Sequence, residues 1–258
     1  MRHATRTTIV LAGCAFLSAC CTGQGRAPAE AALAVSATAA APDVPPTEPA
    51  PAADASAPAI PVPPYAAGTS VPLLAPRLGG GLPLMTALER RASSRSFAPG
   101  PLDLQLLSDL LWAANGVNRP ADGHRTAPTA RNRQDLDVYV VLADGAYFYD
   151  PAGRALVPAA AGDLRPLAGT QDFVATAPLN LVYVSDLAKI AGDAREDQLT
   201  YAGAHACFVS QNVYLFCASA GLATVVRASF DKAALAAALQ LRPEQLAVLS
   251  QTVGYPGP

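Results

Sequence analysis

Hydrophobic positions divide the 258-residue chain into three regions. An unbroken apolar run lies at 9–17, residues 22–72 show no regular apolar spacing, and residues 73–258 repeat apolar positions at helix and strand periods. Regular spacing is what allows a segment to bury one face in a core. We therefore expect one folded domain over 73–258, and roughly 185 residues suffice for a sizeable core.

Helical spacing in this domain predicts several α-helices. The clearest has leucines at 104, 106, 107, 110 and 111 and a stop at Asn115-Gly116, and the longest is rich in small residues and ends at Gly221. We expect α-helices over 82–92, 103–114, 197–220 and 232–239, shorter ones over 163–167 and 171–176, and a helical turn after Pro243.

Apolar runs between turn residues predict strands. They lie at 137–142, 147–149, 155–157, 180–184, 223–227 and 248–253, and Asp144-Gly145 marks a hairpin between the first two. The polar stretch 117–134 is expected to be a long loop. Helices mixed with hairpin-linked strands indicate an α+β fold rather than a doubly wound sheet.

The N-terminal region has the pattern of an export signal. Arg2 and Arg6 precede the apolar run 9–17, which is too short to span a bilayer, and Leu17-Ser18-Ala19-Cys20 resembles a lipobox. We expect a signal peptide over 1–19, lipidation of Cys20, and an exported protein anchored to a membrane on the periplasmic side or cell envelope. The alternative is ordinary secretory cleavage beside incidental cysteines.

Proline and alanine dominate the second region. Residues 22–72 hold 11 of the 24 prolines, and proline removes hydrogen-bond donors without supplying a core. We expect a disordered tether from Cys20 to residue 72. An alanine-rich helix over 29–41 is the alternative, but prolines flank it and no polar/apolar pattern supports it.

Charge and cysteine usage exclude several functions. The net charge is −2 and becomes more negative if residues 1–19 are removed, which argues against nucleic-acid binding. No Cys-x-x-Cys pair or histidine cluster is present, so we expect no metal site. Cys207 and Cys217 lie ten residues apart in one predicted helix, roughly 15 Å, which is beyond disulfide reach.

Arginine is concentrated where the domain begins. Seven of the 18 basic residues fall between positions 90 and 133, all of them Arg, and the densest stretch is Arg90–Phe97, with serines between the arginines. A guanidinium binds phosphate with two parallel hydrogen bonds, so this stretch could hold a phosphate. The alternative is a solvated helix end whose cations favour the helix dipole.

Five segments together resemble the nitroreductase family of FMN enzymes. The first is the RxSxRxF motif formed by Arg91, Ser93, Arg95 and Phe97. The helix at 102–116, the loop 125–132, the glycine turn 221–224 after the long helix and the pair Phe230-Asp231 follow in the same order. The helix and loop resemble the thiazoline/oxazoline peptide dehydrogenase branch, and the similarity covers about 83–256.

The resemblance implies a three-layer sandwich with a central, mostly antiparallel sheet, in an intertwined homodimer that binds FMN at its interface. The phosphate and ribityl chain would contact 91–95, the flavin ring a loop of the partner subunit, N5 the main chain before Phe230, and the pyrimidine edge an amide. The implied residues are Arg91, Ala92, Ser93 and Arg95; Pro128, Thr129 and Asn132; Ala228 and Ser229; and Gln171.

The implied activity is hydride transfer through flavin N5 between a donor and a small organic acceptor, by a ping-pong mechanism. No side-chain acid is required because the cofactor carries the chemistry. Since nicotinamides are scarce outside the cytoplasm, a quinol or a protein would suit an exported enzyme as donor. The alternative is a lipid-anchored binding or structural module that has lost tight flavin binding, which the uncharged segment 254–258 favours, because many relatives carry a cation there.

Overall fold

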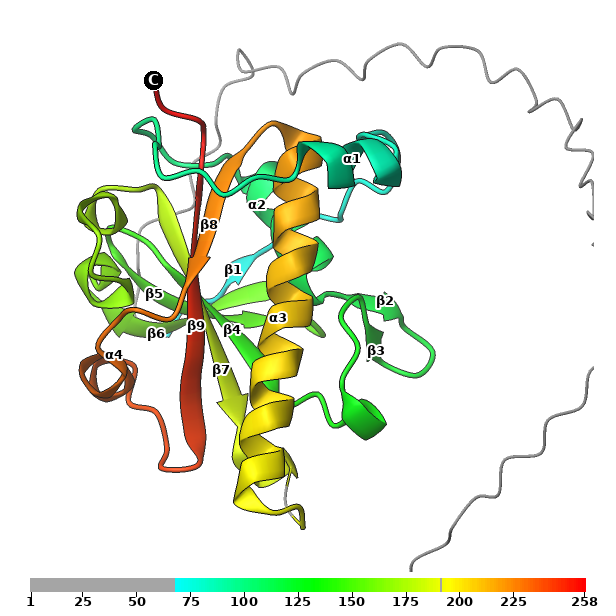
Figure 1. Ribbon diagram of the computed structural model, residues 1–258, viewed down its shortest axis with the longest axis vertical. Helices are drawn as coiled ribbons and strands as arrows, with labels where there is room; N and C mark the ends of the chain where they lie inside the picture. Colours follow the sequence, from blue (N-terminus) through cyan, green and yellow to red (C-terminus); the bar gives the residue numbers. More distant parts are fainter. Residues whose placement is uncertain (1–67, 191) are drawn as a thin grey trace, which may run out of the picture. The chain divides into compact units, whose positions relative to one another are not determined.

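The structure is a computed structural model that describes residues 68–190 and 192–258. The expected signal peptide, Cys20 and all but the end of the expected tether lie outside these residues. The described part is an α+β fold around a seven-stranded sheet of order β1-β6-β5-β4-β7-β9-β8 (Figure 1). Every pairing in this sheet is antiparallel, as expected.

The strands of the sheet follow the chain order only in part. Their bounds are β1 Val71–Pro72, β4 Leu136–Val141, β5 Gly145–Asp150, β6 Ala155–Ala161, β7 Leu179–Asp186, β8 Ala223–Arg227 and β9 Gln245–Gly254. A separate hairpin joins β2 Val117–Arg119 to β3 His124–Arg125. β9, the last strand in the sequence, lies inside the sheet between β7 and β8.

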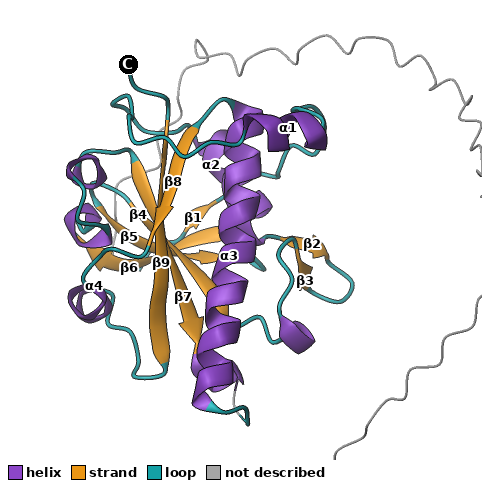
Figure 2. Ribbon diagram, viewed as in Figure 1, coloured by secondary structure: helices purple, strands orange, loops and turns teal. Residues whose placement is uncertain are grey.

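Helices cover both faces of the sheet and complete three layers. The α-helices are α1 Leu84–Arg90, α2 Leu104–Asn115, α3 Arg195–Ala220 and α4 Lys232–Ala238, and the 3-10 helices are η1 Ala130–Asn132, η2 Arg165–Ala168, η3 Asp172–Ala175 and η4 Leu187–Ile190. Figure 2 shows α3 on one side of the sheet and α4 on the other. No helix in the described ranges combines the length and apolar content that crossing a bilayer requires.

Each strand of the sheet's centre is buried on both faces. Val138 and Val140 of β4 join the core under α2 and α3, whereas Tyr139 and Val141 join the core under η2, η3 and α4. Alternate residues of a strand point to opposite faces, so both sets can be apolar. All eight residues of β7 are buried, which explains the apolar run 181–184 at its centre.

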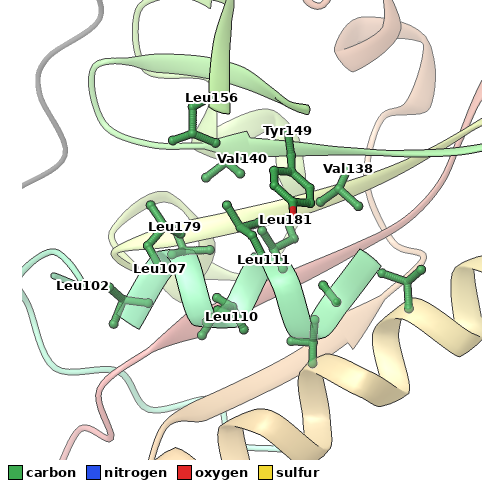
Figure 3. Close-up of a cluster of buried hydrophobic side chains, with 14 of the residues drawn as sticks. Leu102, Leu107, Leu110, Leu111, Val138, Val140, Tyr149, Leu156, Leu179 and Leu181 are labelled. Atoms are coloured by element: carbon green, nitrogen blue, oxygen red, sulfur yellow. The ribbon is translucent and has the colours of Figure 1, made fainter. Parts of the chain in front are cut away.

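The leucine face of α2 forms much of the first core (Figure 3). Leu107, Leu110 and Leu111 are at most 1% exposed and lie against the sheet near Val140 and Leu181. Full burial of one leucine contributes about 1.5–3 kcal/mol, an upper value because the unfolded chain is already partly compact. The leucines whose spacing predicted this helix are therefore the same residues that stabilise it.

Two glycines end helices for different reasons. Gly221 follows α3 with a φ of 69°, the left-handed conformation expected of a helix stop. Gly116 follows α2 with an ordinary φ of −74°, but a Cβ there would lie 2.5 Å from Trp112 Cδ1. Close approach of the Trp112 ring therefore requires glycine at position 116.

Three expectations about the elements were wrong. The stretch 117–134 is not a plain loop, because it contains the β2–β3 hairpin and η1. No helical turn follows Pro243: a turn closed by Gln245 N–H on Arg242 O (2.9 Å) leads directly into β9, three residues earlier than expected. The sheet also begins at Val71, before the expected boundary, where it pairs with Leu156.

Candidate functional site

The RxSxRxF segment leaves α1 at Arg91 and runs extended beside the start of β8. Ser94 N–H donates to Thr224 O of β8 (2.9 Å). Phe97 forms an isolated bridge with Pro256, and its ring lies 5.3 Å from that of Phe173 in η3. The segment is thus held between the end of the chain, β8 and the layer of η2 and η3.

Tyr214 of α3 ties this segment to the sheet. Its hydroxyl is hydrogen-bonded to Ser93 Oγ (2.8 Å) and accepts the N–H of Val226 in β8 (3.1 Å). The guanidinium of Arg91 lies 5.3 Å above its ring. Tyr214 was not singled out in the sequence, and the available signal was only that a buried tyrosine needs a partner for its hydroxyl.

Two exposed arginines of the segment have no acidic partner. Within the described ranges no ion pair involves Arg91 or Arg95. Ala92 and Ser94 line a small cavity of about 130 Å³ against Tyr214. The site therefore presents two guanidiniums that could bind an anion.

A buried cation lies at the end of β8. Arg227 is 7% exposed, and burial lowers its pKa to about 10, so it stays charged at neutral pH. Its guanidinium contacts only neutral acceptors, and its Nε has no hydrogen-bond partner in the described structure. The acceptors are Ala168 O (3.2 Å), Asn180 Oδ1 (3.4 Å), Ser250 Oγ (3.1 Å), Val225 O (3.4 Å) and Thr252 Oγ1.

The chain between η2 and η3 brings Gln171 to the same place. Thr170 N–H donates to Ser229 O (3.2 Å), which joins this connection to the end of β8. A Cβ on Gly169 would lie 2.8 Å from Arg227 Cδ and 3.2 Å from Gln171 Oε1, so this close approach requires glycine. Gln171 Oε1 is buried without a hydrogen-bond partner among the described residues.

Phe173 connects the two groups of predicted residues. Its ring contacts Phe97 of the RxSxRxF segment and lies 5.4 Å below the guanidinium of Arg227. Ala228 and Ser229 follow Arg227 directly and are exposed. The structure thus brings Gln171 and the 228–229 main chain together, and places the 91–97 segment beside them.

The third predicted group lies elsewhere on the chain. Ala130 N–H donates to His205 Nε2 (2.8 Å) on α3, nine residues before Tyr214 and roughly 13 Å away along the helix. Pro128 and Asn132 are exposed, and the Thr129 hydroxyl accepts Gln134 N–H (3.0 Å). Within one chain, the loop 128–132 does not join the Arg91 segment.

The described residues show no metal centre and no disulfide. No group of three or more His, Cys, Asp or Glu side chains in these ranges is arranged to hold a metal ion. Cys207 is exposed and Cys217 is buried, and both are free thiols. Burial raises the pKa of the Cys217 thiol, so it remains protonated.

Comparison with known proteins gives one consistent result. The model of the nitroreductase family matches residues 88–255. A Methanocaldococcus jannaschii protein assigned as a nitroreductase is 31% identical over 157 residues, 57% of this chain and 79% of that protein. A Ralstonia eutropha JMP134 crystal structure, of a protein also assigned as a nitroreductase, is 40% identical and covers 78% of this chain and 98% of its own, with a TM-score of 0.70.

A more distant structure shares the fold. A Staphylococcus epidermidis protein assigned as an NAD(P)H:FMN oxidoreductase is 13% identical, covers 71% of this chain and 92% of its own, and has a TM-score of 0.53. The family match spans the RxSxRxF segment, α2, α3, β8 and β9. This chain belongs to the nitroreductase family.

Proposed function

We propose that the domain is an FMN-dependent oxidoreductase. The observation that carries the proposal is the junction at Phe173, where the arginine-rich segment meets the end of β8. Polar atoms there are unused by the protein: Arg91 and Arg95 lack carboxylate partners, and Gln171 Oε1 and Arg227 Nε are buried without hydrogen bonds in the described structure. Buried polar groups normally have partners, so this set fits a polar ligand with an anionic end.

Each group of residues has a role in this proposal. Arg91, Ser93 and Arg95 bind the phosphate and ribityl chain, with Tyr214 fixing Ser93. The main-chain N–H groups of the exposed residues Ala228 and Ser229 would donate to the ring, and Gln171 would bind its pyrimidine edge. Bound there, FMN supplies hydride transfer between a donor and a small organic acceptor in a ping-pong reaction.

We also propose that the enzyme is a homodimer whose second copy completes the site. The loop 128–132 cannot reach the Arg91 segment of its own chain, whereas a symmetric partner could present it. Exposed apolar side chains offer a surface for that partner, because large exposed apolar groups mark interfaces. They are Leu84 (63% exposed), Met85 (74%) and Leu88 (42%) on α1 and Phe208 (45%) on α3.

Titration with FMN tests this proposal. The full chain, purified in detergent, should bind FMN and give a yellow protein. Arg91→Ala should weaken binding roughly tenfold or more because a charge-assisted contact is lost, and Arg91→Lys should fall between, since it keeps the charge without the fork. Arg195→Ala is the control: it makes the same charge change on an exposed residue at the far end of α3.

Sedimentation in the same samples tests the dimer. A chain that binds no FMN would overturn the hypothesis of an FMN-dependent enzyme. Equal FMN affinities of Arg91→Ala and Arg195→Ala would show that the phosphate does not bind at Arg91. A monomer that binds FMN with full affinity would show that the partner's loop is not part of the site.

The alternative is a domain that keeps the fold and has lost tight flavin binding. Its support is the segment 254–258, which carries no cation and lies against the RxSxRxF segment. Gly257 N–H donates to Ser96 O (3.1 Å), Ala98 N–H donates to Tyr255 O (2.9 Å), and the Ser96 hydroxyl donates to Pro258 O (3.0 Å). A colourless protein that does not bind added FMN but binds small organic molecules would support this alternative.

We further propose that the domain works outside the cytoplasm, tethered by a lipid on Cys20. The support is the order of the basic start, apolar run and lipobox in residues 1–20. The donor proposed for that location is a quinol or a protein, so a quinol analogue should bleach the bound flavin faster than NADPH. The likeness to the thiazoline/oxazoline peptide dehydrogenase branch rests on sequence segments alone and stays a prediction.

A further inference from the structure

A buried histidine on α3 contacts the loop 128–132. His205 is 2% exposed, its Nε2 accepts Ala130 N–H (2.8 Å), and its Nδ1 lies 2.6 Å from Asp135 Oδ1. The ring also stacks on Tyr201 (centroids 5.9 Å apart). His205 therefore links the loop to the core at the N-terminal half of α3.

The hydrogen bonds determine where the proton of the ring lies. An amide N–H can only donate, so Nε2 must offer its lone pair to Ala130, and the proton lies on Nδ1, which donates to Asp135. The other carboxylate oxygen of Asp135 accepts the Ser185 hydroxyl (2.7 Å). Burial opposes ionisation of Asp135, but the hydrogen bonds from His205 and Ser185 outweigh it and lower its pKa.

The loop itself has a strained backbone. Arg131, Asn132 and Gln134 have φ values of 54°, 52° and 46°, in the left-handed region that residues with a side chain rarely adopt. Such conformations cost about 1–3 kcal/mol each and persist only where surrounding contacts impose them. Directly after the loop, Arg133 is ion-paired with Asp193, so His205 is one of several tethers.

We propose that His205 is a positioning residue for the loop 128–132: its Nε2 holds the Ala130 amide, and the Asp135–Ser185 pair holds the ring in the tautomer that makes this possible. The inference rests on the proposed function, in which this loop completes the flavin site of a second copy. Pro128 and Asn132 of the loop are exposed. Because His205 holds the Ala130 amide between them, these two residues are presented in a defined arrangement.

A matched pair of variants separates this role from simple core packing. In His205→Gln the side-chain carbonyl oxygen reaches the position of Nε2 and can still accept from Ala130. In His205→Asn the amide nitrogen takes the position of Nδ1 and can still donate to Asp135, but nothing reaches the loop. Both variants keep a polar amide in the same pocket. The shorter Asn also leaves a larger void, but a general loosening of the core speeds exchange of the β7 amides as well as of Ala130, whereas loss of the tether speeds only Ala130.

Hydrogen exchange of the Ala130 amide in the full chain is the first measurement, and it needs no flavin. Loss of one hydrogen bond of about 1 kcal/mol should speed exchange of this amide roughly five- to tenfold in His205→Asn. His205→Gln should stay near the wild type. The amides of β7 serve as the internal standard, because they report global opening. FMN affinity is the second measurement. We expect it to be highest in the wild type, lower in His205→Gln and lowest in His205→Asn.

The outcomes distinguish this inference from the proposed function. Equal Ala130 exchange in both variants would overturn the positioning role, whatever FMN does. Faster Ala130 exchange in His205→Asn alone, with no FMN binding by the wild type, would support the positioning role of His205 and overturn the flavin function. Faster exchange with unchanged FMN affinity would show that the loop is held by His205 but does not form part of the flavin site. If neither variant folds, Ala130→Pro removes the donor directly, and unchanged exchange of the Asn132 and Arg133 amides in that variant would overturn the positioning role.

Discussion

Asp137 shows how one buried charge affects the stability of the domain. It lies on β4 with its side chain 18% exposed, and Lys189 Nζ is 3.6 Å from its carboxylate. Burial raises the pKa of Asp137, and the attraction of Lys189 offsets only part of this effect. Ionised Asp137 therefore opposes folding, since the unfolded chain solvates the same charge without cost.

We expect Asp137→Asn to stabilise the domain at pH 7, because it removes the buried charge. A carboxyl whose pKa is raised in the folded state stabilises that state below its ordinary pKa, and this contribution disappears as the pH rises through the raised value. The variant should thus have a higher Tm than the wild type at pH 7 and an equal one near pH 3. Thermal unfolding at both pH values measures this difference.

Glu244→Gln serves as the control for charge, because Glu244 is exposed in the turn before β9. A similar gain in both variants would mean that net charge, rather than burial of Asp137, is responsible. A lower Tm for Asp137→Asn at pH 7 would mean that the ion pair with Lys189 outweighs burial.

At the scale of elements, long periodic segments were predicted well from the sequence. The helices α2 and α3, the β4–β5 hairpin, β7 and β8 lie where the apolar pattern placed them, within a few residues. These elements bury the residues that make the pattern, so the signal and the stabilising contacts are the same. The α+β class followed from the mixture of helices and hairpin-linked strands, and the nitroreductase fold from the resemblance of the motif segments.

Short elements were missed because contacts distant in sequence create them. β2 and β3 have three and two residues with no apolar alternation. Thr126, directly after β3, ties the hairpin to the end of α2 by donating to Trp112 O (3.2 Å) and Gly116 O (2.9 Å). β1 exists only through its pairing with β6. Local sequence carries little information about such pairings.

The same limit applied to the candidate site. The motif residues 91–95 and 228–229 could be proposed because they resemble a known pattern. Tyr214 could not, since its role depends on Ser93, 121 residues away. The role of His205 could not be proposed either, since its hydrogen bond with the Ala130 amide joins residues 75 positions apart.

The start of α2 gives a prediction at this scale. Asp103 is its N-cap, and its Oδ1 accepts Leu106 N–H (2.7 Å). Asp103→Ala should lower the free energy of unfolding by about 1 kcal/mol, because a donor of the first turn loses its partner. Chemical denaturation measures the loss. Asp103→Asn keeps the acceptor and should be close to the wild type; an equal loss in both variants would show that the charge at the helix start, not the cap, matters.

For the whole molecule, the proposed anchor makes a prediction about location. Cys20→Ser removes the thiol that would carry the lipid and leaves residues 68–258 unaltered. We expect the wild type in the membrane fraction, labelled by a fatty acid, and Cys20→Ser without the label. Cys21→Ser is the matched control and should keep both properties. A wild type without label would leave ordinary secretory cleavage as the explanation of residues 1–20.

The interior position of β9 has a consequence for how the domain forms. β8 pairs in the sheet only with β9, and β9 also pairs with one edge of β7. The sheet therefore cannot be completed until residues 245–254 are present. A growing chain can therefore assemble the β4–β5–β6 part but not close the sheet before synthesis of the last strand. Under the export proposed above, this order would keep the sheet open until residues 245–254 have been made, which suits passage through a membrane as an extended chain.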